Sequence, residues 1–309
     1  MSKIYAYIGV CLIFCLSIGR LAAEEKIRAC AAIPPIQWMV EQIGGESVDA
    51  WTLLPEGKGP HVYQPRPSDM KKLHKTDLYF KVGLPFENKI IERIRDSYPD
   101  LRIISVSDGI AMIRSEHLED REDSEDRREH DARHIHGEYD PHIWLDPLRA
   151  LVIAENIRDV LIGTKPEMSA NYRTNYQDLK AHLLGLHELF KVWFEPVTDR
   201  TFYVYHPAFR YLADRYHLHE VALEKEGKSP GPQYLAQLMK EAKHAAVIFR
   251  QPQFPEESVR NLADELDAEI QVVNPLAYHY LDNMKSIGAK IMMALQLHKQ
   301  NEAKGTDLF

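Results

Sequence analysis

Cysteine is scarce in this sequence, and two of its three cysteines, Cys11 and Cys15, lie in the apolar N-terminal segment. Cys30 is then the single cysteine of the mature chain, which excludes an internal disulfide and argues against a thiolate metal site. An excess of positive charge is also missing, since the formal net charge is −8. A surface that binds the phosphates of nucleic acid is therefore not expected.

Long hydrophobic runs are missing after the N-terminus, so the mature chain is not expected to span a membrane. The one long run, Ile4–Ile18, follows a lysine and precedes the small-residue stretch Leu21–Ala23, which is the order of a secretory signal peptide. We predict cleavage of a signal peptide at residues 1–23 and export to the periplasm. A retained signal-anchor helix is the alternative. The cysteines of the run do not follow the small residues that a lipid-attachment site needs.

Short apolar runs alternate with helical patterns along the rest of the chain. The predicted strands are Lys26–Ala31, Val48–Leu54, Leu78–Val82, Arg102–Val106, Thr201–Tyr205, Ala245–Phe249 and Ile270–Val273. The helical patterns between them include Ile36–Ile43, Asp69–Leu73, Ala150–Ile162 and Pro207–Tyr216. Strands separated by helices form parallel βαβ units, so the sequence predicts an α/β fold.

A longer amphipathic pattern over Lys165–Phe194 predicts one helix of about 29 residues, or about 43 Å, which would overrun a single domain. Four predicted strands precede it and three follow it. We therefore expect two α/β lobes with parallel sheets, joined by this backbone helix. The N-terminal lobe would span 24–163, the linking helix 164–195 and the C-terminal lobe 196–309. A bundle helix inside one domain is the alternative.

Residues 115–140 interrupt the alternation with a dense mixture of acidic, arginine and histidine side chains. Such a segment cannot bury a core, so it predicts a mobile surface loop. Its histidines are His117, His130, His134 and His136. They could bind divalent ions weakly as a secondary site, or they could be incidental to a solvated charged insertion.

Histidine is present in unusual number, fifteen in all, and three histidines share a setting on short, stiff connections. His61 follows a Gly/Pro loop after the second predicted strand, and His206 comes directly after the strand Thr201–Tyr205. His142 lies in the proline-flanked segment DPHIWLDP. Because ligands of α/β sheets bind beyond the carboxyl ends of strands, these three side chains are candidates for a shared site.

The spacings between these histidines, 81 and 64 residues, exclude a zinc finger, whose ligands come in close pairs. They fit a site assembled across two lobes. Three imidazoles around a divalent ion form a zinc-like ligand set. Taken singly, each histidine could instead be a helix cap or a hydrogen-bonded surface residue.

Three segments, GPHVYQPRPSD, DPHIWLDP and YHPAFRYLADRY, carry a family resemblance. They resemble the zinc-binding periplasmic solute-binding proteins of ABC transporters, the ZnuA-like branch of a cluster that also holds the manganese-binding TroA and PsaA types. The resemblance runs from about Lys26 to the last helix. It implies two α/β lobes bridged by a rigid helix, a metal ion at their interface, and delivery of that ion to a membrane permease with a separate ATPase.

The resemblance implies that His61, His142 and His206 are the metal ligands. In manganese-type members a Glu takes the place of His206, so His206 favours zinc over a harder cation. Trp144, in the same segment as His142, is expected to pack beside the site as part of its hydrophobic surroundings.

The chain departs from the family at the fourth ligand, where Asn274 replaces the usual Asp in the sequence VVNPL. An uncharged amide oxygen is a poorer ligand than a carboxylate. The site would then contain three histidines and a water, or it would recruit Glu56, His279 or Asp282. Alternatively, Asn274 caps the following turn and another carboxylate fills its place.

We therefore predict a monomeric periplasmic protein without enzymatic activity, which captures Zn²⁺ with high affinity and delivers it to an ABC permease. A manganese- or iron-binding member of the same fold is one alternative. A secreted zinc-dependent hydrolase is another, because three histidines and an open position also form catalytic zinc sites. The hydrolase would need a general base near the metal, and the sequence contains no HExxH motif, which leaves Glu56 as the candidate.

Overall fold

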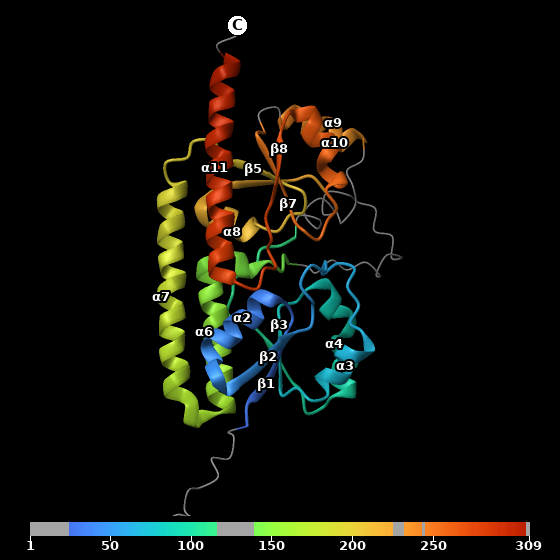
Figure 1. Cartoon of the computed structure of the whole chain (residues 1–309), viewed down its shortest axis with the longest axis vertical. Coiled ribbons are helices and arrows are strands. Elements are labelled where there is room, and N and C mark those ends of the chain that lie inside the picture. Colours follow the sequence, from blue (N-terminus) through green and yellow to red (C-terminus); the bar gives the residue numbers. More distant parts are fainter. Residues whose placement is uncertain (1–24, 116–138, 225–231, 243–244, 307–309) are drawn as a thin grey trace, which may run out of the picture.

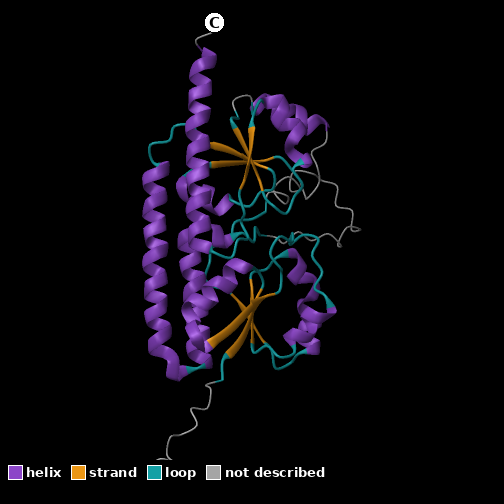
Figure 2. Cartoon of the chain, viewed as in Figure 1, coloured by secondary structure: helices purple, strands orange, loops and turns teal. Residues whose placement is uncertain are grey.

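The computed structural model describes residues 25–115, 139–224, 232–242 and 245–306. These residues form two four-stranded sheets, one above the other, with long helices running beside both (Figures 1 and 2). The strand pairs within both sheets are parallel. The predicted α/β class with two parallel sheets is confirmed. Within the described ranges, no helix combines the length and hydrophobicity that crossing a membrane requires.

The first sheet has the strand order β2-β1-β3-β4. Its strands are β1 (Ile27–Ala31), β2 (Val48–Thr52), β3 (Leu78–Lys81) and β4 (Arg102–Ser105). The helices around this sheet are α2 (Pro34–Gly44), α3 (Pro67–Leu73), α4 (Pro85–Ser97) and α6 (Pro147–Thr164). Helices α2 and α6 lie on the side of the long helices, whereas α3 and α4 lie on the opposite side (Figure 1). Each of these helices begins with proline, whose missing N–H costs nothing in the first helical turn.

The second sheet repeats this arrangement with the strand order β6-β5-β7-β8. Its strands are β5 (Thr201–Val204), β6 (His219–Ala222), β7 (Val247–Arg250) and β8 (Glu269–Val272). The prediction of three strands after the long helix is wrong, because β6 was not recognised. This strand has four residues and lies at the sheet edge, where its side chains are exposed or half-buried, so it lacks an apolar pattern. Helices α8 (Arg210–Tyr216), α9 (Pro232–Glu241) and α10 (Glu257–Leu266) complete this lobe.

Two long helices connect the lobes. Helix α7 (Ser169–Phe194) has 26 residues, and it begins later than the predicted Lys165 because Pro166–Met168 forms a separate short 3-10 turn. Its buried stripe consists of Tyr172, Tyr176, Leu179, Leu183, Leu186, Phe190 and Phe194. Helix α11 (Tyr280–Thr306) packs against α7 and also contacts α2 in the first lobe. Gly288 permits this packing, since a Cβ there would lie 2.3 Å from Cε1 of Phe190.

Candidate metal site

His206 stands at the carboxyl end of β5, and the pairing of β5 with β6 determines its neighbour. Val204 of β5 is in register with Ala222 of β6. His206 and Glu224 both lie two residues beyond this pair, so the parallel register brings them side by side. His206 Nδ1 lies 2.5 Å from Glu224 Oε1, and both side chains are buried. The backbone N–H of Glu224 also donates to the carbonyl of Tyr205 at 2.9 Å.

The backbone of His206 is held from the other side by Gln251, which follows β7. The Gln251 amide donates to the carbonyl of His206 at 2.7 Å and accepts from its N–H at 3.2 Å. Burial lowers the pKa of the His206 imidazole, and the hydrogen bond with Glu224 opposes that effect. The ring therefore stays neutral near pH 7. With Nδ1 engaged by the carboxylate, Nε2 keeps its lone pair for a metal ion.

His142 is oriented by Asp140 in the same way. The Asp140 Oδ1 atom accepts hydrogen bonds from both the backbone N–H and Nδ1 of His142, each at 2.8 Å. Burial by itself would raise the pKa of Asp140, but the charge and hydrogen bonds of His142 hold that pKa below its ordinary value. The adjacent Trp144 is fully buried, with its ring 5.3 Å from the His142 ring. Its predicted place beside the site matches this geometry.

His61 reaches His206 from the loop between β2 and α3. Its Nε2 atom lies 3.1 Å from Nε2 of His206, and the ring centres are 4.6 Å apart. The rings of His142 and His206 are 5.5 Å apart. The described part of the chain contains no group of three or more His, Cys, Asp or Glu side chains already in metal-holding geometry. A tetrahedral zinc site places ligand nitrogens about 3.3 Å apart, so the separation between His61 and His206 is close to that of a chelating pair.

The three histidines line one pocket between the lobes. The other lining residues are Pro60, Gln251, Gln253, Phe254, Pro275 and Leu276. Gln251 follows β7, Pro275 and Leu276 follow β8, and His206 follows β5. The pocket thus lies beyond the carboxyl ends of the second sheet, at the point where strand order reverses between β5 and β7, which is where α/β sheets bind ligands.

The predicted alternatives for the fourth ligand lie elsewhere. Glu56, His279 and Asp282 are exposed and do not line the pocket. Asn274 is half-buried, and its Oδ1 accepts from the backbone N–H of Leu276 and the amide of Gln253, each at 3.1 Å. Asn274 thus caps the turn that follows it, which is the alternative to metal binding considered in the sequence analysis.

Three of the predictions fall on residues outside the described ranges. These are the signal peptide at residues 1–23, most of the loop at 115–140, and the secondary metal-binding histidines His117, His130, His134 and His136. Asp140, placed at the end of that loop by the prediction, is instead buried and bonded to His142. Tyr139 pairs with Arg114 in an isolated antiparallel bridge, which brings the two ends of the loop together.

Sequence reasoning missed the two carboxylates behind the histidines. Asp140 carries a local signal, because it stands two residues before His142 in the segment DPHIWLDP. Glu224 carries none, since 18 residues separate it from His206 and only the pairing of β6 with β5 joins them. Together the two carboxylates lie directly behind two of the three imidazoles, an arrangement that suits the binding of a divalent cation.

Two α/β lobes with a histidine-lined pocket between them define a two-lobe binding protein with a candidate cation site. Residues 30–294 match the family described as "Zinc-uptake complex component A periplasmic", or ZnuA. The chain belongs to this family. The predicted resemblance to ZnuA-like proteins is thereby confirmed.

Curated relatives and solved structures agree with this membership. The zinc-binding lipoprotein AdcA of Streptococcus pneumoniae serotype 4 is 24% identical over 286 residues, which cover 89% of this chain and 56% of AdcA. The chain thus spans about half the length of that relative. The metal ABC transporter substrate-binding lipoprotein SloC of Streptococcus mutans is 25% identical, over 78% of this chain and 79% of SloC. A crystal structure of ZnuA, 28% identical, superposes with a TM-score of 0.79 over 88% of this chain and 100% of that one.

A zinc-bound deletion mutant of ZnuA gives a similar result, with 29% identity and a TM-score of 0.77 over 87% of this chain and 98% of that one. The names of these relatives describe metal-binding and substrate-binding proteins, and zinc is the metal most of them specify.

Proposed function

We propose that this chain is an extracytoplasmic solute-binding protein that captures Zn²⁺ between its lobes through His61, His142 and His206. The observation that carries the proposal is the convergence of the three imidazoles on one pocket, with Nε2 of His61 3.1 Å from Nε2 of His206. Two of the rings are oriented by buried carboxylates, an arrangement typical of zinc-binding histidines. Family membership and the zinc-binding relatives support the same ligand.

The donor set favours zinc over manganese or iron. Imidazole nitrogen suits Zn²⁺, whereas Mn²⁺ favours carboxylate and other oxygen ligands. Among the described residues that line the pocket, none carries a carboxylate. The fourth position would be filled by water, because the Asn274 oxygen already accepts two hydrogen bonds and Glu56 is exposed.

The captured ion would be delivered to the membrane permease of an ABC transporter with its ATPase. Delivery requires that the ion can be released from its ligands, and these ligands come from both lobes. His61 belongs to the loop between β2 and α3, whereas His206 follows β5 in the other lobe. A separation of the lobes would break the zinc shell. Action in the periplasm as a monomer, after removal of the signal peptide, is part of the same proposal.

The hydrolase alternative has little support in the site. A general base must lie within hydrogen-bond reach of a metal-bound water. Glu56 is exposed and outside the pocket lining, and the carboxylates of Asp140 and Glu224 are engaged by histidine nitrogens. The site is therefore better suited to holding an ion than to activating water.

Calorimetric titration of the mature chain with Zn²⁺ tests the proposal. We expect one tight site, and a severe loss of affinity in His61→Ala, His142→Ala and His206→Ala. His182, which is exposed on α7, provides the control, and His182→Ala should bind as the unchanged chain does. Unchanged affinity in two of the three pocket variants would overturn the assignment.

A further inference from the structure

The turn after β7 forms one side of the pocket that the three histidines line. Its residues Gln251, Gln253 and Phe254 all line the pocket. The Phe254 N–H donates to the carbonyl of Gln251 at 3.1 Å and closes the turn. Arg250, the last residue of β7, donates from its guanidinium to the carbonyl of Phe254 at 2.7 Å. The sheet therefore fixes where this turn places its side chains.

The Phe254 ring packs against the histidine that follows β5. The ring centres of Phe254 and His206 are 5.3 Å apart, and the ring planes are tilted by 34°. Phe254 also meets the ring of Tyr205 edge-on, with 5.0 Å between the centres. The Phe254 side chain is half-buried and lines the pocket, so it occupies space beside any ion that His206 binds.

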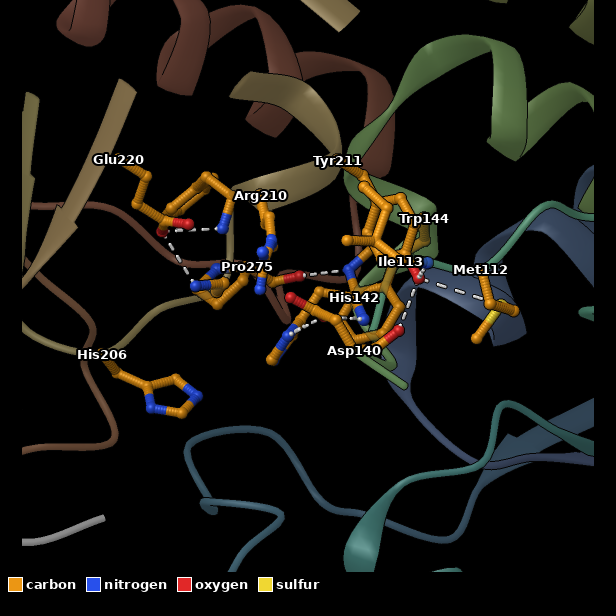
Figure 3. Close-up of polar contacts among 12 residues, drawn as sticks. Met112, Ile113, Asp140, His142, Trp144, His206, Arg210, Tyr211, Glu220 and Pro275 are labelled. Atoms are coloured by element: carbon orange, nitrogen blue, oxygen red, sulfur yellow. Dashed lines mark hydrogen bonds and ion pairs between the residues drawn. The ribbon is translucent and has the colours of Figure 1, made fainter. Parts of the chain in front are cut away.

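Hydrocarbon forms much of the remaining wall. Pro60, Pro275 and Leu276 also line the pocket, and their side chains carry no atom that could bind an ion. Figure 3 shows Pro275 beside His142. The carbonyl of Pro275 already accepts a hydrogen bond from the Trp144 indole at 2.8 Å. These residues therefore present an apolar surface to the histidine cluster.

The two glutamines of the pocket are engaged by their neighbours. The Gln251 amide bonds to both the N–H and the carbonyl of the His206 backbone. The Gln253 amide donates from Nε2 to Oδ1 of Asn274 at 3.1 Å. Gln253 also packs close to the loop between β2 and α3, since a Cβ at Gly59 would lie 3.6 Å from the Gln253 Cβ. The turn is thus held between the end of β5 and that loop.

Ligand type alone does not separate zinc from its neighbours in the first transition series. Imidazole nitrogen also suits Ni²⁺, so selectivity between such ions depends on geometry. Zn²⁺ is stable with four ligands in a tetrahedron, which three histidines and one water provide. Ni²⁺ and Co²⁺ carry six ligands in water, so a three-histidine site holds them well only if it admits further waters. The apolar wall of this pocket opposes such hydration.

We propose that Phe254 is a specificity-determining residue of this site. Its ring fills the space beside His206 that additional waters on the ion would need, so four-coordinate Zn²⁺ binds well and six-coordinate Ni²⁺ and Co²⁺ bind poorly. This inference rests on the proposed function. It adds a basis for selection that the donor atoms do not supply, because the wrong ion is denied its further ligands. The bonds of Arg250 and Gln251 hold the turn and keep the ring in place.

The ratio of zinc affinity to nickel affinity tests the inference, with chelator competition as the assay for each ion. Phe254→Ala should lower this ratio at least about tenfold, because water can enter where the ring was. Phe254→Val should lower it less, and Phe254→Leu, which keeps most of the volume, should lower it least. A purely structural defect would weaken the binding of both ions alike. If Phe254→Ala does not fold, as judged by circular dichroism, Phe254→Val takes its place in each comparison.

Co²⁺ absorption gives a second readout, since tetrahedral Co²⁺ absorbs visible light far more strongly than six-coordinate Co²⁺. The unchanged chain should show strong bands, and Phe254→Ala should show weak ones. Leu266→Ala is the control. Leu266 ends α10 and packs against the same hydrophobic cluster as Phe254, but it does not line the pocket. This variant should lower the free energy of unfolding and leave the affinity ratio and the cobalt bands unchanged.

Several results would overturn the inference. An unchanged affinity ratio in Phe254→Ala, or cobalt bands as strong as those of the unchanged chain, would show that the ring does not limit coordination. A ratio in Phe254→Leu as low as in Phe254→Ala would show that side-chain volume is not the cause. In each case tight zinc binding by the unchanged chain would leave the proposed function standing. Absence of zinc binding by the unchanged chain would remove both.

Discussion

Asp140 and His142 form a closed unit in which one carboxylate oxygen accepts both the ring Nδ1–H and the backbone N–H of the histidine, each at 2.8 Å. The carboxylate fixes the tautomer of the ring and its angle to the backbone. It also makes the imidazole a better donor to a cation. Because Asp140 and His142 are only two residues apart, the DPH sequence forms this unit through local contacts alone.

Replacing Asp140 with Ala should therefore weaken zinc binding while leaving all three histidines in place. Second-layer carboxylates of this kind are worth about 10- to 100-fold in metal affinity, and a loss of that size is expected. Competition with a fluorescent zinc chelator measures it. Asp100→Ala, at an exposed turn before β4, is the control and should have no effect. Equal affinities for the two variants would contradict the role assigned to Asp140.

Glu224 performs the same task for His206 through the register of β5 and β6. Glu224→Gln keeps the shape of the side chain but removes its charge, so the His206 ring becomes a weaker ligand. Zinc affinity should fall about 10- to 100-fold. The exposed Glu269 of β8 offers a matched control, and Glu269→Gln should bind zinc normally. The interpretation fails if both variants keep full affinity.

Asn274 is expected to act on stability and not on metal binding. Its side-chain oxygen accepts from the Leu276 N–H and the Gln253 amide, so Asn274→Ala should lower the free energy of unfolding by about 1 kcal/mol. Urea unfolding of the metal-free chain measures this change. Zinc affinity should stay close to that of the unchanged chain. A loss as large as that of a histidine variant would instead identify Asn274 as a ligand.

The metal-free protein should lose stability on acidification below about pH 6.5. Burial lowers the pKa of His206 from 6.5 in the folded state, and Glu224 offsets this only in part. The unfolded chain then takes up a proton that the folded chain resists, so falling pH favours unfolding until the folded pKa is reached. His206→Gln should flatten this dependence in thermal unfolding, whereas His182→Gln should not. Equal slopes for all three chains would contradict the prediction.

Deletion of residues 116–137 should preserve the tight zinc site. Arg114 and Tyr139 already pair across the base of this segment, so a short linker can replace it. Asp140 and His142 follow the deleted segment and keep their mutual bonds. Calorimetry should show the tight site intact and only weaker additional binding removed. Loss of the tight site would mean that the segment contributes to it.

Much of the fold could be predicted because its signals are local. The strands of the first sheet are short apolar runs with turn residues at both ends, and the stripe of α7 repeats every three or four residues. Edge strand β6 could not be found this way, because its residues are exposed or half-buried. Missing β6 also hid Glu224, whose contact with His206 exists only when β6 pairs with β5.

The sequence by itself determined the chemistry: three histidines on stiff connections, the DPHIWLDP segment, and an uncharged residue at position 274. These are properties of residue type and neighbouring residues. The tertiary structure decided which groups meet. It brought His61 to within 3.1 Å of His206 and placed Glu224 behind that ring. It also engaged the Asn274 oxygen in a turn cap and bonded the Asp140 carbonyl, beside His142, to Tyr211 of α8. Such contacts depend on strand register and lobe packing, which no local pattern encodes.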